Sequence, residues 1–153
     1  EQKSRLGGME IEIVGTDISS RAIDRAQAAA YSQFEVQRGL SIHRLIEHFE
    51  PHGNQWVLKD SVRRWARFER GNLLKPSERL GEFDIIFCRN VLSGMTPDAR
   101  KHTLRMLSAH SGNAGYLVLG KGETITGGGE LYRAMSGAKG VYARSVQVER
   151  QAA

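Results

Sequence analysis

Two polar side chains follow short apolar stretches of this 153-residue sequence, in positions suited to ligand binding. Asp17 follows the β-forming stretch 11–14, and Asn90 follows the run 83–88 after a single arginine. That run is short for a helix and rich in β-formers, as expected of a strand covered on both faces. In open α/β sheets, ligands bind outside the carboxyl ends of strands. A carboxylate and an amide at two strand ends therefore suggest a nucleotide-like ligand.

Both residues also have a plain structural interpretation. Asp17 is of a type common in turns and caps, and it precedes Ser19 and Ser20, either of which can cap a following helix. Asn90 can simply cap the loop after its strand. The only cysteine, Cys88, lies inside the apolar run and is interpreted as a core residue, since no histidine partner is evident.

The composition is that of a soluble globular protein, with 40% hydrophobic and 25% charged residues. The length suits one domain with a single core. No apolar run approaches the roughly 20 residues that cross a bilayer, and no secretory leader opens the chain. A lone thiol fits a reducing compartment, so the sequence predicts a cytoplasmic protein without membrane insertion.

The formal charge of +5 and the pI near 9.7 raise the question of nucleic acid. The basic residues are scattered, however, apart from a modest concentration at Arg63, Arg64, Arg67 and Arg70. A solvated face or a docking surface for an acidic protein is favoured over nucleic acid, which rests on pI alone. The histidines lack metal-ligand spacing, so no metal site is expected.

The hydrophobic periodicity predicts a mixed α/β protein. Strands are expected at 10–16, 62–69, 83–88, 115–120 and 141–146, and helices at 20–30, 42–49, 97–110 and around Leu131. Residues 31–40 are expected to be an irregular connector, and the turn 51–54 to open a small hairpin. Thr96 is the expected N-cap of the helix that Pro97 begins. This alternation predicts a mostly parallel sheet with helices on its faces.

The same residues resemble the CheR family of chemotaxis receptor methyltransferases, which use S-adenosylmethionine to methylate receptor glutamates. Over about residues 10–145 the resemblance follows an ordered series: Gly15-Thr16-Asp17-Ile18-Ser19, Tyr31, Arg38-Gly39-Leu40, Phe49, Trp56, Asn72-Leu73-Leu74, Gly81 to Leu92, Gly115 to Gly120, and weakly Glu123 and Val141-Tyr142. It implies a Rossmann-like class I methyltransferase sheet, mostly parallel with an antiparallel terminal strand and a small hairpin insertion.

The resemblance also assigns cofactor-binding residues. Asp17, with Ile18 beside it, would accept hydrogen bonds from the ribose, Asn72 and Leu73 would border the adenine, and Asn90 and Val91 would lie by the sulfonium end. S-adenosylhomocysteine would be the product. The pair Asn72-Leu73 can equally be a strand exit with a core leucine.

Two departures from the family pattern leave enzymatic activity undecided. The resemblance begins at the family's second strand, so the first strand, its cofactor loop and the helical N-terminal domain lie outside it. Ser93-Gly94-Met95 stands where the family carries Ile-Tyr-Phe, and Gly94 cannot replace a phenol. We therefore expect residues 1–153 to be a single partial methyltransferase domain, and no catalytic residue is assigned.

The segment 50–64 occupies the place of a receptor-facing insertion in the family. We expect it to form a small docking hairpin, with Arg63, Arg64 and Arg67 facing an acidic partner such as a receptor's cytoplasmic domain, and not a peptide-tether site. The alternative function is a non-catalytic protein-binding or self-associating signalling module. An open sheet edge would then favour a homo-oligomer.

Overall fold

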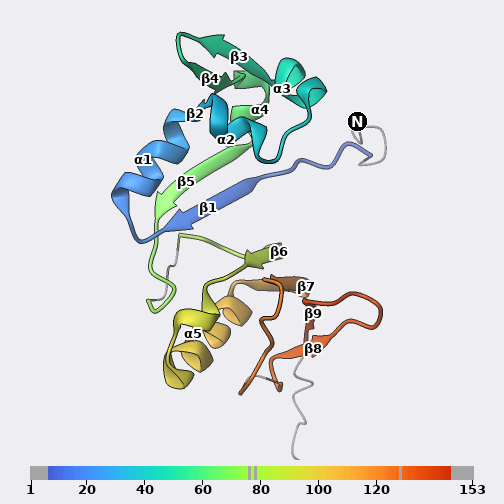
Figure 1. Cartoon of the computed structure of the whole chain (residues 1–153). Coiled ribbons are helices and arrows are strands. Elements are labelled where there is room, and N and C mark those ends of the chain that lie inside the picture. Colours follow the sequence, from blue (N-terminus) through green and yellow to red (C-terminus); the bar gives the residue numbers. More distant parts are fainter. Residues whose placement is uncertain (1–6, 76, 78, 128, 146–153) are drawn as a thin grey trace, which may run out of the picture. The chain divides into compact units, whose positions relative to one another are not determined.

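The computed structural model describes residues 7–75, 77, 79–127 and 129–145 (Figure 1). The chain divides into two compact units, residues 1–72 and residues 73–153. Each unit is described by itself.

The first unit contains a two-stranded parallel sheet of β1 (Ile13–Asp17) and β5 (Ala66–Arg70). Helix α1 (Ser20–Ala28) packs against both strands, and the predicted cap is confirmed because Ser19 Oγ accepts the Ala22 N–H. Gly15 permits this strand pair, since a Cβ atom there would lie 2.6 Å from the Phe68 ring. The predicted strand at 10–16 begins three residues later than expected.

An insertion between α1 and β5 forms a second, antiparallel sheet with the strand order β2-β4-β3. Its elements are β2 (Ala30–Ser32), α2 (Gln33–Gln37), α3 (Ile42–His48), β3 (Phe49–His52), β4 (Gln55–Leu58) and α4 (Asp60–Arg63). The predicted hairpin is confirmed as β3–β4. The predicted irregular connector at 31–40 is wrong, because β4 pairs with β2 and a capping box between Ser32 and Glu35 starts α2.

The strand predicted at 62–69 is also wrong in its first half. Val62 lies in α4, and the strand β5 begins only at Ala66. The Val62 N–H donates to Lys59 O, which closes a helical turn before the chain extends. Local hydrogen bonding therefore outweighs the β-propensity of a single valine.

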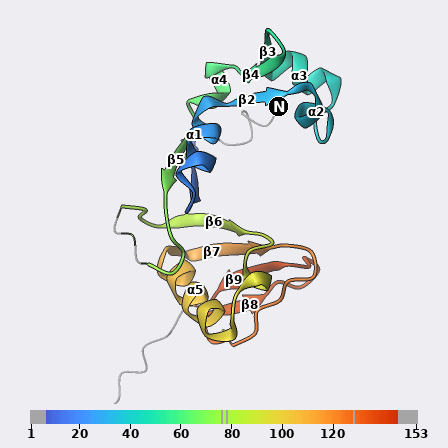
Figure 2. The same ribbon diagram turned by 60° about the vertical axis from the view of Figure 1, so that its left-hand side comes forward.

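The second unit contains a four-stranded sheet in the order β6-β7-β9-β8 (Figure 2). Its elements are β6 (Phe83–Cys88), the 3-10 turn η2 (Leu92–Gly94), α5 (Pro97–Ala109), β7 (Ser111–Leu119), β8 (Tyr132–Ala134) and β9 (Val141–Arg144). Strands β6 and β7 are parallel, whereas β9 is antiparallel to both β7 and β8. The predicted α/β fold with parallel strands and an antiparallel terminal strand is confirmed.

The core of this unit lies between α5 and the sheet. Leu104 and Leu107 of α5 are buried, as predicted, with Leu117 and Leu119 of β7. Thr96 caps the helix and Pro97 begins it, also as predicted. Within the described residues, no helix has the length and apolarity needed to cross a membrane.

Two predictions for the second unit are wrong. Strand β6 is not covered on both faces among the described residues, because Ile85 is 54% and Phe87 72% exposed. The helix expected around Leu131 is strand β8, since β9 supplies an antiparallel partner. The final strand ends at Arg144, and residue 146 of the prediction lies outside the described residues.

Candidate functional site

Asp17 ends β1 with one carboxylate oxygen in use and one available. Its Oδ1 accepts the Ser19 N–H at 2.8 Å, so the turn interpretation of this residue is confirmed. The other oxygen, Oδ2, has no hydrogen-bond partner among the described residues, and the residue is exposed. The turn therefore fixes the side chain of an exposed residue and leaves one carboxylate oxygen without a partner among the described residues.

Ile18 and Asn72 lie at the same edge of the β1–β5 sheet as Asp17. The Gly71 N–H donates to Asp17 O at 3.0 Å, and Arg70 Nε donates to Ile18 O at 3.0 Å. Ile18 is 61% exposed, and Asn72 is half-buried. The first unit thus brings together three of the predicted cofactor residues, one with an exposed apolar side chain.

Leu73 belongs to the second unit, where it packs against the core cluster that contains Leu104 and Leu117. It is half-buried. Its surroundings agree with the interpretation as a core leucine, and its contact with adenine stays a prediction.

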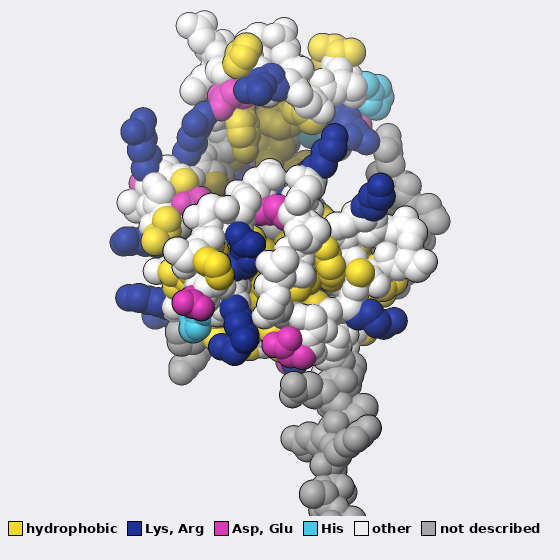
Figure 3. All heavy atoms as spheres, turned by 60° about the horizontal axis from the view of Figure 1, so that its bottom comes forward, with side chains coloured by type: hydrophobic (Ala, Val, Ile, Leu, Met, Phe, Trp, Pro, Cys, Tyr) yellow, Lys and Arg dark blue, Asp and Glu magenta, His cyan; other side chains and the backbone are white. Residues whose placement is uncertain are grey.

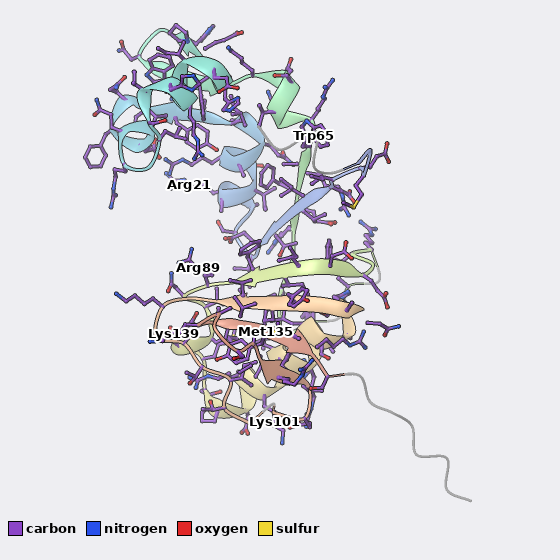
Figure 4. All side chains as sticks on the ribbon, turned by 90° about the vertical axis from the view of Figure 1, so that its right-hand side faces the viewer. Arg21, Trp65, Arg89, Lys101, Met135 and Lys139 are labelled. Atoms are coloured by element: carbon purple, nitrogen blue, oxygen red, sulfur yellow. The ribbon has the colours of Figure 1, made fainter. Side chains whose placement is uncertain are left out.

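Asn90 and Val91 follow β6 in a tight loop. Asn90 has φ of 59°, the left-handed region that asparagine tolerates better than most residues. Val91 is 38% exposed. The preceding Arg89 is exposed at the end of β6 and projects away from the sheet (Figure 4). This loop thus presents an amide and an apolar side chain to solvent.

Glu123 is the residue of this site that sequence reasoning underrated. Its carboxylate accepts three backbone N–H groups, from Asn90 at 2.6 Å, Gly120 at 2.8 Å and Ser93 at 3.1 Å. Burial raises the pKa of this carboxyl, but the three N–H donors outweigh burial and lower the pKa below its usual value. In the sequence, Glu123 stands out only as a carboxylate three residues after Gly120, and nothing local indicates its bonds to Asn90 and Ser93.

Arg100 of α5 binds carbonyl groups of the same loop. It donates to Leu92 O at 3.1 Å, to Met95 O at 3.4 Å and to Thr126 Oγ1 at 3.2 Å. A hollow of about 330 Å³ opens here, lined by Asn90, Leu92, Ser93, Arg100 and residues 121–124. Gly94 lies in η2, with no atom within 4 Å of the position a Cβ would take.

Cys88 is a core residue, as interpreted from the sequence. It is 4% exposed. Burial, with a smaller effect of the Glu123 charge, raises the pKa of its thiol to about 11. The thiol is therefore protonated at neutral pH and poorly nucleophilic.

Arg63, Arg64 and Arg67 lie in α4, just after it and in β5, around a hollow of about 550 Å³ that Gln27, Asp60, Ala66 and Phe68 also line. Arg67 is bound to Glu12 and Glu69 at 2.5 Å each, and these hydrogen bonds raise its pKa. Arg63 and Arg64 are exposed and form no ion pair with a described residue. Elsewhere, Lys and Arg side chains are scattered over the face shown in Figure 3.

The sequence matches the family model described as CheR methyltransferase, SAM binding domain, over residues 1–141. The chain belongs to the CheR methyltransferase family. Its mixed sheet, with parallel strands and antiparallel terminal strands, is that of a Rossmann-like S-adenosylmethionine-binding domain.

Curated relatives agree with this assignment. The chain is 40% identical to chemotaxis protein methyltransferase 1 of Vibrio cholerae over 128 residues, which is 82% of this chain and 46% of that protein. It is 33% identical to chemotaxis protein methyltransferase Cher2 of Pseudomonas putida over 143 residues, 92% of this chain and 52% of that protein. The chain thus spans about half the length of these relatives.

A similar but shorter match is the probable biofilm formation methyltransferase WspC of Pseudomonas aeruginosa, 37% identical over 83 residues, or 53% of this chain and 19% of that protein. The described residues also offer no metal site, because no group of three or more His, Cys, Asp or Glu among them could hold a metal ion.

Proposed function

We propose that this CheR-family chain supplies the cofactor-binding residues for S-adenosylmethionine-dependent O-methylation of glutamate side chains on chemotaxis receptors. The observation that carries the proposal is the Asp17 carboxylate at the end of β1, held by the Ser19 N–H and keeping Oδ2 free. A ribose offers two hydroxyl donors, and a carboxylate at the carboxyl end of a strand is suited to accept them.

The other residues present also fit the cofactor. Ile18 and Val91 expose apolar side chains beside the polar atoms of Asp17 and Asn90, and a nucleoside ligand has both kinds of surface. As the family resemblance implies, Asn72 and Leu73 are proposed to contact the adenine, and Asn90 and Val91 the amino-acid end.

The chemistry asks little of the protein beyond alignment. When bound, S-adenosylmethionine supplies an electrophilic methyl group. A receptor glutamate is ionised at neutral pH, because its ordinary pKa is about 4.3, so no general base is needed to activate it. The residues of this chain then have to bind and orient the cofactor and to exclude water from the reacting groups.

Arg63 and Arg64 are proposed to dock an acidic partner surface, here the cytoplasmic domain of a receptor. Both guanidinium groups are exposed beside the apolar atoms of Ala66 and Phe68. Arg67 contributes as the third arginine of this surface, but its pairs with Glu12 and Glu69 neutralise it and fix its position. Arginine is well suited to bidentate contact with carboxylates.

Methyl transfer to a receptor fragment tests this proposal. The full-length protein and radiolabelled S-adenosylmethionine should yield base-labile methyl esters on receptor glutamates. The double variant Arg63→Glu/Arg64→Glu should lose most of this labelling, since like charges across an interface repel. The matched control Arg133→Glu, an exposed arginine of β8, should not. Absence of base-labile labelling in the parent protein would reject the proposed reaction.

A non-catalytic binding module is the second candidate, favoured by Gly94. This exposed glycine offers no side chain where the family carries a tyrosine. Among the described residues of the first unit, β1 pairs only with β5, and within the second unit β6 pairs only with β7. An edge left unpaired in this way favours self-association. Light scattering of the parent chain tests this candidate, because a monomer at high concentration would contradict edge pairing.

A further inference from the structure

The loop between β6 and α5 depends on one side chain from outside it. The N–H groups of Asn90 and Ser93 both donate to Glu123, which lies about 30 residues further along the chain. These two N–H groups have no partner in a described strand or helix, and they find one in a carboxylate. The conformation of the loop is therefore tied to residue 123.

The carboxylate joins two turns at once. Glu123 Oε2 accepts the N–H groups of Asn90 and Gly120, and Oε1 accepts the N–H of Ser93. Gly120 directly follows β7, so the turn after β7 is fastened to the loop after β6. Hydrogen bonds to a charged acceptor are about twice as strong as neutral ones. The three together make a charged latch between neighbouring strand ends.

The latch acts on the residue whose backbone needs it most. Asn90 has φ of 59°, a conformation that only a minority of non-glycine residues adopt. Gly120 leaves room for this arrangement, since a Cβ there would collide with Asn90 Oδ1 and lie 2.7 Å from Glu123 Oε2. Such a conformation persists where surrounding contacts impose it.

Arg100 completes the arrangement from the other side. It donates to the carbonyl groups of Leu92 and Met95 and to Thr126 Oγ1. The segment 120–126 therefore contacts the loop 90–95 in two ways. Glu123 accepts N–H groups of the loop, and Thr126 accepts a hydrogen bond from Arg100, which also donates to carbonyl groups of the loop. Both polarities of the loop backbone are satisfied by side chains of opposite charge.

We propose that Glu123 is a positioning residue that holds Asn90 and Val91 in the conformation that binds the cofactor, an inference that rests on the proposed function. Glu123 does not itself contact the cofactor. It orders the loop before the cofactor binds, so that less conformational entropy is lost on binding and the affinity is higher.

The test compares Glu123→Gln with the matched control Glu130→Gln, an exposed glutamate that forms no hydrogen bond or ion pair with a described residue. Glutamine keeps the size of the side chain, but its NH₂ group cannot accept the third N–H. Three readouts are taken on the full chain: amide hydrogen exchange without ligand, affinity for S-adenosylhomocysteine by calorimetry, and thermal midpoint.

In Glu123→Gln, we expect amide protection to fall at Asn90, Ser93 and Gly120 and to persist in β7. The affinity for S-adenosylhomocysteine should fall about tenfold, the loss of one charge-assisted hydrogen bond. Glu130→Gln should match the parent in amide protection and in affinity for S-adenosylhomocysteine. Unchanged protection at the three amides, or unchanged affinity once protection is lost, would overturn the proposal.

If Glu123→Gln does not fold, the parent chain decides the question. Its Asn90, Ser93 and Gly120 amide proton shifts should move together on acidification, as one carboxylate titrates, and independent movement would overturn the latch. If the parent chain binds no S-adenosylhomocysteine, the proposed function fails, and with it the positioning role. The exchange data then report separately whether Glu123 fastens the loop.

Discussion

Gly120 and Asn90 lie so close together that a Cβ atom on Gly120 would collide with Asn90 Oδ1 and lie 2.9 Å from the Asn90 backbone nitrogen. The same Cβ would lie 2.7 Å from Glu123 Oε2. The turn after β7 and the loop after β6 are therefore packed at the limit that glycine allows. This contact brings together the loop that carries two predicted cofactor residues and the carboxylate that holds it.

Replacing Gly120 by alanine should destabilise this contact. Overpacking at such a site costs about 1–3 kcal/mol, because the neighbours are backbone and a held carboxylate. The free energy of unfolding from urea titration measures the effect. Gly129→Ala is the matched control, since no atom lies within 4 Å of its Cβ position. Equal stability of the two variants would contradict the packing described.

The stability contributed by Glu123 should depend on pH with a defined sign. The pKa of Glu123 is lowered in the folded chain, so its stabilising effect is complete above the ordinary value of 4.5 and is lost as the pH falls through the lowered folded value. Arg100 and Lys121 line the same hollow, and the Cys88 thiol stays protonated over this range because its pKa is about 11.

Denaturant unfolding of the parent and of Glu123→Gln, followed from about pH 6 to about pH 3, measures this dependence. The difference in unfolding free energy should be present at the higher pH and shrink toward the lower. Glu35, whose pKa is also lowered, is common to both proteins and cancels. A difference that stays constant over the range would show that Glu123 does not act through its charge.

Introducing the tyrosine that the family carries should test Gly94. The position is exposed and open, so Gly94→Tyr should leave the free energy of unfolding within about 0.5 kcal/mol. If a phenol contributes one hydrogen bond to the reaction, methyl transfer should rise about tenfold in Gly94→Tyr and not in Gly94→Phe. Equal rates in the two variants would mean that the hydroxyl has no role.

Truncation of Leu104 should destabilise the second unit strongly. This residue is fully buried in α5 against β7, and truncation of a buried leucine to alanine costs about 2–5 kcal/mol. Thermal or denaturant unfolding measures the loss. Ile42→Ala, at a 70% exposed position of α3, is the control and should change stability by about 0.5 kcal/mol or less. A small effect at Leu104 would contradict the assigned core.

The elements with strong local signals were predicted well. Strand β6 was placed at its observed bounds, and α5 was placed to within one residue, because Thr96 and Pro97 mark its start. The β3–β4 hairpin followed from the turn residues at 51–54. Each of these signals lies within a few residues of the element that it specifies.

The errors arose where a distant partner decides the structure. Strands β2 and β8 have three residues each and exist because β4 and β9 pair with them, which no local pattern reveals. The exposure of Ile85 and Phe87 likewise depends on what lies beside β6. Propensity over three residues cannot compete with such tertiary pairing.

The candidate site was predicted in part. The core position of Cys88 agrees with the structure, and Asp17 forms the turn that was its plain alternative. Arg63, Arg64 and Arg67 line one hollow, and their contact with an acidic partner stays a prediction. The role of Glu123 could not be read from the sequence, because its three hydrogen bonds reach residues 3 to 33 positions away. The cofactor contacts themselves stay predictions.

Calorimetric titration with S-adenosylhomocysteine tests the central claim most directly. The parent chain should bind in the micromolar range, and Asp17→Asn should weaken binding about tenfold or more, because it can keep the hydrogen bond from the Ser19 N–H while losing the charge and the free acceptor. Asp24→Asn, at an exposed position of α1, should bind like the parent. Binding that is equal in all three proteins, or absent from the parent, would contradict the proposed cofactor site.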